Sequence, residues 1–206
     1  MTRLPVNPAA LRAAADLIAA GGVVAAPTDT LYALAADPFH SNAVARLFAV
    51  KGRPAGRALP LMAADVAQVV SHFGVLPSTG RCLAERFWPG PLTLLVRAPP
   101  TLLEQVTGGT GRVGVRVPAA AVARDLCRVC GRPLTATSAN ASGRPATPDP
   151  DEVERTLGAR IDLLLDGGRA PGGPPSTIVD VTGPVAQLVR AGAIAWDEVL
   201  ACLDGG

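Results

Sequence analysis

The residue whose type most suggests chemistry is Lys51, the only lysine among 206 residues. The other 18 basic side chains are arginines, although a compact ammonium group and a planar guanidinium group are not interchangeable. A chain that uses arginine almost everywhere, yet keeps one lysine in the segment 51–54 (Lys-Gly-Arg-Pro), indicates a chemical role for Lys51 and its neighbour Arg53. The alternative is an ordinary lysine on a solvated loop, where a single charge contributes little.

Further polar side chains gather where predicted strands begin or end. These are Thr28, Asp29, Thr30, Ser138, Asn140, Ser142 and Ser176. The basic residues nearest to the same strand ends are Lys51, Arg53, Arg116 and Arg190. Open α/β sheets bind ligands at strand ends, and hydroxyls among several cations suit a ligand with many negative oxygens, such as a nucleotide. The competing explanation is that these residues cap turns. Asp29 is the nearest candidate for a general base, and we expect it to cap its turn.

Three other motifs resemble functional sites, but the sequence around each of them favours a structural role. The segment 109–114 matches G-x-G-x-x-G, but it opens a strand where a dinucleotide site needs a helix, so a hairpin loop is the better interpretation. Cys127 and Cys130 form a C-x-x-C pair at a predicted helix end, with no second pair at zinc spacing, which indicates packing and no metal site. His40 and His72 lie far apart, so the sequence does not support a catalytic triad.

Composition sets the broad class of the protein. With 49% hydrophobic and 17% charged residues, the chain is globular. A net charge of +2 and seven aromatic residues offer little phosphate attraction or base stacking for RNA. No apolar run is long enough to span a bilayer. The four cysteines show no disulfide framework, which favours a reduced, cytoplasmic protein.

Hydrophobic periodicity predicts a mixed α/β protein with a single domain over residues 1–206. We expect helices at 9–20, 42–49, 65–73, 78–87, 118–130, 149–157 and 196–203. We expect strands at 23–26, 59–62, 92–96, 113–117, 134–137, 161–165, 177–181 and 186–189. Because the last strands follow one another directly, the pattern favours a mixed sheet with helices packed on it. Lys51 falls just past the helix at 42–49, and alternation along 113–117 places Arg116 opposite the valines.

Seven segments, in order and over nearly the whole chain, resemble the YrdC/TsaC family of threonylcarbamoyl-AMP synthases. They are 27–32 (Pro-Thr-Asp-Thr-Leu-Tyr), 51–54 (Lys-Gly-Arg-Pro), 88–93 (Trp-Pro-Gly-Pro-Leu-Thr), 116–118 (Arg-Val-Pro), 138–140 (Ser-Ala-Asn), 176–180 (Ser-Thr-Ile-Val-Asp) and 188–192 (Leu-Val-Arg-Ala-Gly). The resemblance implies a single YrdC-like domain with an open, twisted α/β sheet around a basic concave cavity. It also implies a nucleotidyltransferase that joins L-threonine, bicarbonate and ATP into L-threonylcarbamoyl-AMP and releases pyrophosphate.

The resemblance also implies roles for individual residues. Those expected to bind L-threonine are Thr30, Arg116, Ser138 and Ser176. Those expected to bind ATP are Lys51, Arg53, Asn140 and Arg190, with Lys51 and Arg53 as the catalytic cations. Mg²⁺ would arrive bound to ATP, without protein ligands. The product would feed threonylcarbamoyl modification of tRNA through downstream transfer proteins, and a weak contact with tRNA is compatible with this role.

Two alternatives stay open at this point. The first is a relative that forms carbamoyl adenylate from carbamoyl phosphate, although such domains sit beside zinc-binding modules in larger chains. The second is a non-catalytic RNA-binding module that uses the basic cavity, against which the low charge and few aromatic residues argue. The chain ends soon after the matching segments, so we expect no counterpart of the additional C-terminal domain of longer family members.

Overall fold

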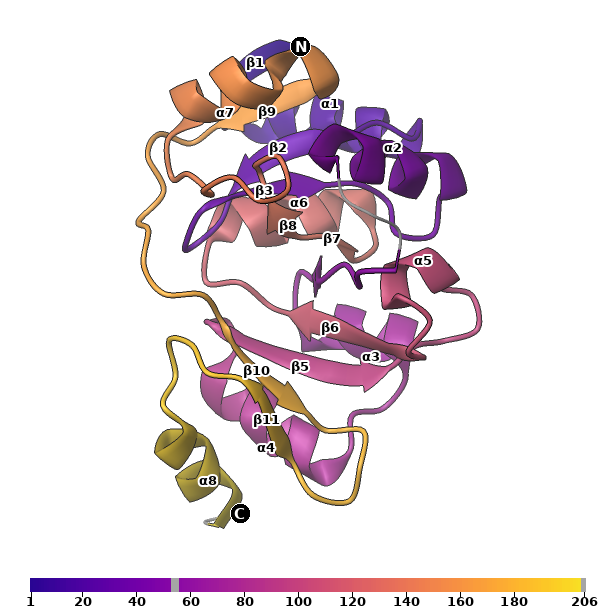
Figure 1. Ribbon diagram of the computed structural model, residues 1–206, viewed down its shortest axis with the longest axis vertical. Helices are drawn as coiled ribbons and strands as arrows, with labels where there is room; N and C mark the ends of the chain where they lie inside the picture. The colour runs from indigo at the N-terminus through magenta and orange to yellow at the C-terminus, as the bar shows by residue number, and fades with distance from the viewer. Residues whose placement is uncertain (53–55, 205–206) are drawn as a thin grey trace.

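The computed structural model describes residues 1–52 and 56–204. The chain folds as a mixed α/β protein, as the sequence predicts, and its strands divide between two hydrogen-bonded sheets (Figure 1). One sheet lies in the upper half of the molecule and the other in the lower half, with a long connection from residue 167 to residue 176 running between them along one side.

The upper sheet has five strands in the order β1-β9-β2-β3-β8. They are β1 (Thr2–Pro5), β9 (Leu163–Asp166), β2 (Val24–Pro27), β3 (Tyr32–Ala35) and β8 (Thr137–Ser138). β9 pairs in parallel with β1 and β2, whereas β3 pairs antiparallel with β2 and β8. The pattern misses β1 and β3. β1 is an edge strand exposed at both ends and β3 is buried throughout, so neither shows an alternation of apolar and polar residues.

The lower sheet has six strands in the order β11-β10-β5-β6-β4-β7. They are β11 (Gln187–Arg190), β10 (Thr177–Asp180), β5 (Leu92–Arg97), β6 (Arg112–Arg116), β4 (Leu61–Met62) and β7 (Leu134–Thr135). β5 pairs in parallel with β10 and antiparallel with β6, so this sheet is mixed too. The segment 109–114 enters β6, which confirms that it opens a strand.

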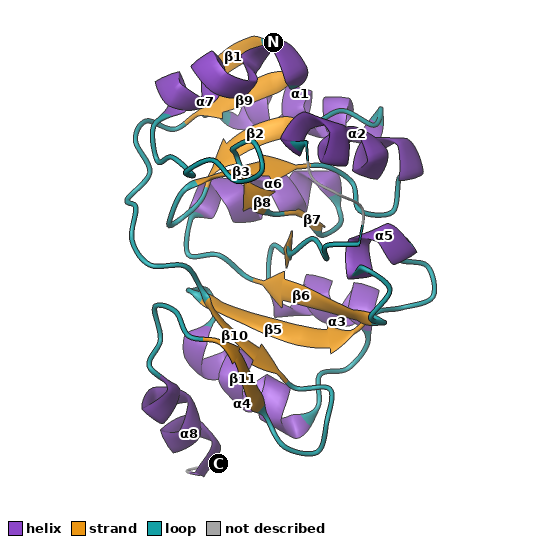
Figure 2. Ribbon diagram, in the orientation of Figure 1, coloured by secondary structure: helices purple, strands orange, loops and turns teal. Residues whose placement is uncertain are grey.

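Helices pack on the outside of both sheets (Figure 2). They are α1 (Pro8–Ala19), α2 (Ser41–Lys51), α3 (Val66–Phe73), α4 (Ser78–Phe87), α5 (Glu104–Thr107), α6 (Ala121–Cys130), α7 (Pro150–Leu157) and α8 (Trp196–Asp204), with a short 3₁₀ turn at Gly158–Arg160. α1, α2 and α7 accompany the upper sheet, and α3 and α4 lie behind the lower one. None of the described helices combines the length and the apolar character needed to cross a membrane.

The segment 134–138 joins the two sheets. Its first two residues pair with β4 in the lower sheet and its last two pair with β3 in the upper sheet. The Thr135 hydroxyl reinforces this step, because it donates to the Leu34 carbonyl (3.1 Å) and accepts from the Ala36 amide (2.9 Å). The predicted strand at 134–137 is therefore split, and each half belongs to a different sheet.

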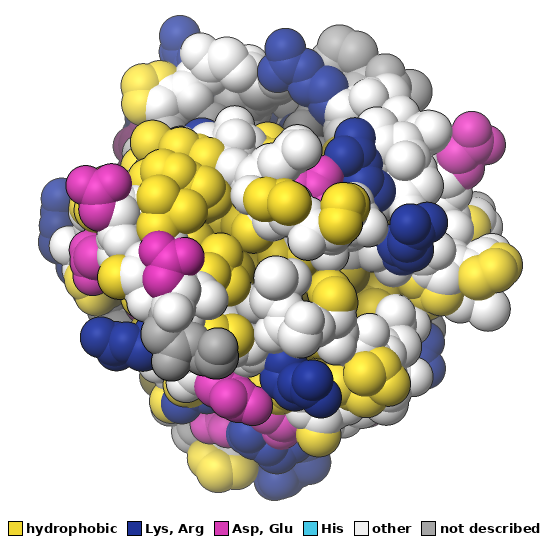
Figure 3. Space-filling model, turned by 90° about the horizontal axis from the view of Figure 1, so that it is seen from below, with side chains coloured by type: hydrophobic (Ala, Val, Ile, Leu, Met, Phe, Trp, Pro, Cys, Tyr) yellow, Lys and Arg dark blue, Asp and Glu magenta, His cyan; other side chains and the backbone are white. Residues whose placement is uncertain are grey.

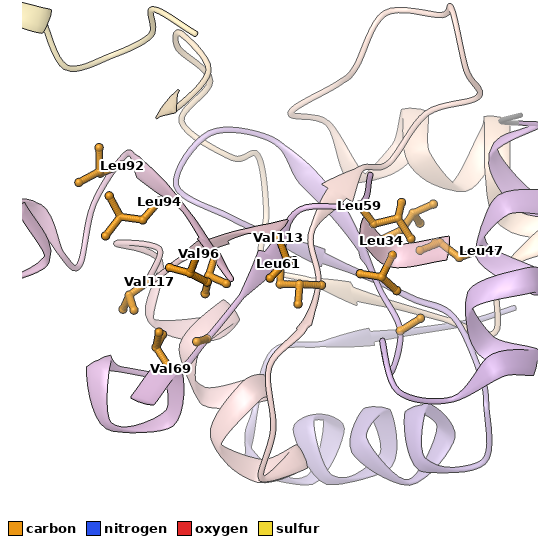
Figure 4. Packing of buried hydrophobic residues seen from close by; sticks show 14 of the residues in the cluster. Leu34, Leu47, Leu59, Leu61, Val69, Leu92, Leu94, Val96, Val113 and Val117 are labelled. Carbon is orange, nitrogen blue, oxygen red and sulfur yellow. The ribbon is translucent and has the colours of Figure 1, made fainter. Parts of the chain in front are cut away.

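A shared apolar core lies between the sheets and their helices. One cluster of buried side chains contains Leu34 and Leu47 from the upper half together with Leu61 and Leu94 from the lower half (Figure 4). A second cluster, with Ile18 of α1 among its members, lies where α1 and α6 cover the upper sheet. The buried apolar surface stabilises the position of one sheet relative to the other.

Capping residues fix both ends of α2, the helix that leads into the Lys-Gly-Arg-Pro segment. The Ala43 amide donates to His40 Nδ1 (3.3 Å), so His40 is the N-cap and Ser41 is the first helical residue, one residue before the predicted start at 42. At the other end Gly52 adopts φ +57°, a left-handed conformation that glycine tolerates and that ends helices. The helix therefore includes Lys51, and the prediction that Lys51 lies on a loop past the helix is wrong.

Candidate functional site

A cavity of about 540 Å³ lies between the two sheets, within the size range of small-molecule sites. Its walls include the β2–β3 turn and β8 from the upper sheet, and β5 and β6 from the lower sheet. Residues 58–62, Gly173, Pro175, Ser176 and Arg190 also line the cavity. Gly114 and Arg116 face this cavity while Val113 and Val115 are buried in the core, so the predicted alternation along this strand is confirmed.

The β2–β3 turn is held closed by Thr28. The Thr28 amide and hydroxyl both donate to the Leu31 carbonyl, at 3.0 and 2.7 Å. The amides of Thr30 and Leu31 donate back to Thr28 Oγ1, at 3.2 and 3.3 Å. The prediction that Asp29 caps this turn is wrong, because the hydroxyl of Thr28 already occupies that role.

Asp29 reaches across to the lower sheet and holds Arg116. Arg116 Nη2 donates to Asp29 Oδ2, and Arg116 Nε donates to the Gly90 carbonyl at 2.8 Å. The side chains of Arg116 and Asp29 are only 14% and 15% exposed. Burial lowers the pKa of Arg116 and the Asp29 carboxylate opposes that change, so the guanidinium keeps its charge. With Nε and Nη2 engaged, Nη1 is the nitrogen left to meet an anionic ligand in the cavity.

Asp29 also has an oxygen that the fold leaves unsatisfied. Its Oδ2 accepts from both Arg116 and the Ala119 amide (3.2 Å). Its Oδ1 is buried and has no hydrogen-bond partner among the residues that the structure describes. A buried carboxylate oxygen without a partner is unfavourable, so Asp29 is held where it is by the charge of Arg116.

Thr93, Ser176 and Arg190 form a hydrogen-bonded row on the opposite wall. The hydroxyls of Thr93 and Ser176 are 2.8 Å apart and both side chains are buried. Arg190 Nη2 donates to Ser176 Oγ (3.2 Å) and to the Ser176 carbonyl (2.7 Å). Arginine only donates. If Thr93 also donates to Ser176, the Ser176 proton is directed toward the cavity. Burial lowers the pKa of Arg190, which still carries its charge.

Lys51 lies behind the β8 wall. Only 4% of the residue is exposed, and its ammonium donates to the Ser138 carbonyl, the Asn140 carbonyl (2.9 Å) and Asn140 Oδ1 (3.3 Å). The Ser138 hydroxyl donates to the same Asn140 side-chain oxygen. The lysine ammonium thus donates to several acceptors of the turn at 138–140. This arrangement suits a compact ammonium better than a planar guanidinium.

The structure brings most of the predicted site residues together. Those that line the one cavity are Thr30, Arg116, Ser138, Ser176 and Arg190. Lys51 and Asn140 are not part of the lining, and they support Ser138 from behind. Arg53 lies outside the described residues. The individual roles expected for these side chains stay predictions.

Thr93 is one of the cavity residues that the sequence pattern did not predict. It lines the cavity and contacts Ser176. A signal for it exists in the sequence, because Thr93 is a polar residue between Leu92 and Leu94 in an otherwise apolar strand. Buried polar residues need partners, and such a position therefore indicates a polar contact inside the fold.

The chemistry that this arrangement supports follows from its groups. Two arginines face a cavity that also presents several hydroxyls and an apolar surface. Fixed cations and hydroxyls bind carboxylate and phosphate oxygens and stabilise negative charge that develops on them. Among the described residues, no group of three or more His, Cys, Asp or Glu could hold a metal ion.

Comparison with known proteins agrees with this geometry. The Sua5/YciO/YrdC family model, described as telomere recombination, matches residues 16–192. A threonylcarbamoyl-AMP synthase of Pyrococcus abyssi is 38% identical over 189 residues, which are 92% of this chain and 56% of that protein. A threonylcarbamoyl-AMP synthase of Thiobacillus denitrificans is 39% identical over 171 residues, which are 83% of this chain and 89% of that protein.

Among solved structures, Pyrococcus abyssi Sua5 complexed with L-threonine matches with a TM-score of 0.90 and 36% identity. The match covers 98% of this chain and 59% of that one. The chain thus spans little more than half the length of its Pyrococcus relative.

Proposed function

The chain belongs to the Sua5/YciO/YrdC family, and on that premise we propose that it is an L-threonylcarbamoyl-AMP synthase. The reaction joins L-threonine, bicarbonate and ATP into L-threonylcarbamoyl-AMP and releases pyrophosphate. The observation that carries the proposal is that Thr30, Arg116, Ser138, Ser176 and Arg190, all expected to contact substrate, line one cavity between the two sheets.

The cavity suits an amino acid on one side. Arg116 is a largely buried, fixed cation with Nη1 left for a carboxylate, and such a charge-assisted contact is stronger than one between neutral groups. The hydroxyls of Thr30, Ser138 and Ser176 surround the same space. We assign L-threonine to these four residues.

The remaining groups suit ATP. Arg190 faces the cavity beside Ser176, and Lys51 and Asn140 support Ser138 at the opposite wall. We assign the nucleotide and its phosphates to Lys51, Asn140 and Arg190, together with Arg53. Lys51 would act mainly by fixing the turn at 138–140 and by placing a positive charge behind it.

The reaction needs positioning more than a nucleophilic side chain. The amine of L-threonine takes up bicarbonate as a carbamate with loss of water. A carbamate oxygen then attacks the α-phosphorus of ATP, and the bond to pyrophosphate breaks. Negative charge builds on the phosphoryl oxygens and on the leaving pyrophosphate, and fixed arginine and lysine cations lower the energy of that transition state.

Magnesium would enter with ATP. The described residues provide no group of three or more carboxylates or histidines for it, and Asp29, the acidic residue that holds Arg116, does not line the cavity. Mg²⁺ commonly binds through substrate phosphates and keeps water ligands. We therefore assign it no protein ligand.

We also propose that the product serves tRNA modification through downstream transfer proteins, in a cytoplasmic setting. A role confined to RNA binding is less well supported. On the face shown in Figure 3, basic side chains are interspersed with acidic and apolar ones, and no continuous basic stripe crosses it. RNA binding by backbone contacts relies on such clustered positive charge.

The decisive experiment is pyrophosphate release by purified protein in degassed, bicarbonate-free buffer. We expect full activity only when L-threonine, bicarbonate and ATP are all present, because only the assembled carbamate supplies the attacking group. A relative that uses carbamoyl phosphate would release pyrophosphate without L-threonine. An ATPase would release phosphate instead, and an RNA-binding module would release neither. Pyrophosphate formed at full rate without L-threonine would overturn the proposal.

A further inference from the structure

A pair of thiols lies outside the cavity, where α4 meets α8. Cys82 Sγ of α4 and Cys202 Sγ of α8 are 3.1 Å apart. Each thiol also faces the other residue's backbone. Cys82 Sγ lies 3.1 Å from the Cys202 carbonyl oxygen, and Cys202 Sγ lies 3.6 Å from the Cys82 carbonyl oxygen. Both residues are partly exposed.

Packing of the two helices fixes this approach. Val199 of α8 and Leu83 of α4 are fully buried in the same apolar cluster, and Cys202 and Leu203 pack against it. In Figure 1, α8 lies beside α4 at the lower end of the molecule. The two sulfurs therefore meet because the helices are docked, and neither thiol depends on a long, free side chain to reach the other.

We propose that Cys82 and Cys202 form an intramolecular disulfide when the protein meets an oxidising low-molecular-weight disulfide. An S–S bond is about 2.05 Å long, so the sulfurs need to approach by about 1 Å. The other two cysteines serve as an internal contrast. Cys127 is buried in the core, where its thiol donates to the Met62 carbonyl (3.4 Å), and it shares α6 with Cys130.

The oxidation balances as two thiol–disulfide exchanges. One cysteine thiolate attacks oxidised glutathione, forms a mixed disulfide and releases one reduced glutathione. The second cysteine thiolate attacks the protein sulfur of that mixed disulfide and releases the other glutathione. The two protein thiols lose two protons and two electrons, and the glutathione disulfide gains them.

Protonation of the thiols sets how fast the exchange begins. Burial, together with the contact to Cys82, raises the pKa of Cys202 to about 11. Since the thiolate is the attacking species, we expect the rate of the first exchange to rise with pH. Arg86 lowers the pKa of Cys202 and Glu85 raises it, and both lie on α4 near the pair.

The two helices lead directly to elements of the cavity. α8 follows the segment 191–195, whose Ala193 amide donates to the Pro175 carbonyl (2.9 Å) and whose Ile194 amide donates to Thr177 Oγ1 (2.9 Å). α4 leads into the turn whose Gly90 carbonyl accepts from Arg116. The disulfide would therefore link the segment 191–195, which holds the residues beside Ser176, to the turn whose Gly90 carbonyl holds Arg116.

The test is incubation of the folded protein with oxidised glutathione, followed by intact mass and peptide mapping. We expect loss of two hydrogens, a peptide that links Cys82 to Cys202, and a melting temperature raised by about 5–10 °C, because the bond closes a long loop. Amides of α8 should exchange at least about tenfold more slowly. Dithiothreitol should reverse all three changes.

Matched variants separate the pair from general oxidation. Cys82→Ser and Cys202→Ser should each abolish the linked peptide and the melting shift, whereas Cys130→Ser should keep both. Accumulation of glutathione adducts on Cys82 and Cys202 without a linked peptide would overturn the proposal. So would a melting shift that persists in Cys82→Ser. Mapping of the unmodified protein decides the question even if a serine variant fails to fold.

Discussion

At the scale of single residues, Thr93 shows how a buried hydroxyl can orient another one. Ser176 accepts from Arg190 and shares a hydrogen bond with Thr93. If Thr93 is the donor, the proton of Ser176 can only point to the cavity. Thr93 would then be a positioning residue for the L-threonine site, because its effect passes through Ser176.

We expect Thr93→Val to raise the KM for L-threonine about tenfold, the loss of roughly one hydrogen bond, and to leave the KM for ATP nearly unchanged. Valine keeps the branched shape inside β5, and Thr93→Ser should restore most of the affinity. Steady-state pyrophosphate release with each substrate varied in turn measures both constants. An unchanged KM for L-threonine in Thr93→Val, or an equally weak Thr93→Ser, would rule out this role.

Lys51 is the second case at this scale, and its burial changes what its replacement should do. We expect Lys51→Arg to lower turnover at least ~10²-fold, the scale of losing one fixed charge-stabilising group. The larger, planar guanidinium cannot reproduce the three contacts to Ser138 and Asn140, so the free energy of unfolding should also fall by ~1–3 kcal/mol.

Pyrophosphate assays and urea denaturation check the two parts of this prediction. Arg57→Lys, an exchange of the same two residue types at an exposed position, should change neither quantity. Near-normal turnover of Lys51→Arg would show that any cation suffices at position 51.

At the scale of elements, the adjacent strands β10 and β11 bring Ser176, just before β10, into hydrogen-bond contact with Arg190, the last residue of β11. The sequence predicts that loss of Arg190 weakens ATP binding more than L-threonine binding, and that loss of Ser176 does the opposite. Arg190 also holds Ser176 through the carbonyl and the hydroxyl. A close approach reinforces this contact, because a Cβ on Gly192 would lie 2.3 Å from the Pro175 carbonyl oxygen.

We therefore expect Arg190→Ala and Ser176→Ala to keep those opposite preferences but to combine non-additively, with a coupling energy of ~1 kcal/mol. Calorimetric titration of both single variants and the double variant with each ligand measures it. Equal losses for both ligands in each single variant would show that the two side chains do not divide the substrates between them.

β1 and β9 give an element whose stability should depend on pH. Asp166, the last residue of β9, accepts from the Gly168 amide (2.9 Å) and from Arg3 Nε (3.0 Å) and Nη2 (2.8 Å). Donation from Gly168, and then Arg3, lowers the pKa of Asp166 despite partial burial. The folded pKa lies below the unfolded value of about 3.9. Its stabilising contribution is therefore full above pH ~4 and is lost as pH falls through the folded pKa.

Urea midpoints at neutral and acid pH check this dependence. Asp166→Asn should be less stable than the parent at neutral pH, and the difference should shrink as pH falls below about 4. Asp16→Asn, at an exposed position on α1, should track the parent at both values. A constant difference between Asp166→Asn and the parent across this range would contradict the linkage.

The elements also show what sequence can and cannot predict. Asn7-Pro8 marks the start of α1 through its own capping chemistry, and the predicted α1 and α4 agree closely with the structure. The predicted end of the second helix at residue 49 is wrong, because α2 continues to Lys51 and ends at Gly52. Of the polar residues at predicted strand ends, Thr28, Thr30, Ser138 and Ser176 line the one cavity, whereas Asp29, Asn140 and Ser142 do not. The burial of Lys51 could not be predicted, because its acceptors lie 87 and 89 residues further along the chain. The division into two sheets depends on the step at Ala136, where a single apolar strand pattern changes partners.

At the scale of the whole molecule, the cavity exists only because two sheets are held apart and joined at one edge. Arg116 and Thr93 come from the lower sheet, while Thr30 and Ser138 come from the upper one. The Asp29–Arg116 ion pair is a direct bridge between the two sheets beside the cavity. A ligand that contacts both walls should therefore stabilise their arrangement, by mass action on the folded state.

We expect L-threonine at about 100 times its Kd to stabilise the fold by about 2.7 kcal/mol, which corresponds to a melting shift of roughly 5–10 °C for a chain of this size. Arg116→Ala should lose this shift, because the cation that would hold the carboxylate is gone.

Arg112→Ala offers a matched control. Arg112 lies on the same strand, β6, but pairs with Asp180 and does not line the cavity. It should melt at a lower temperature without ligand and still respond fully to L-threonine. Differential scanning fluorimetry over a series of L-threonine concentrations measures both effects. A full response in Arg116→Ala would place the L-threonine carboxylate elsewhere, and loss of the response in both variants would point to a damaged fold instead of a lost contact.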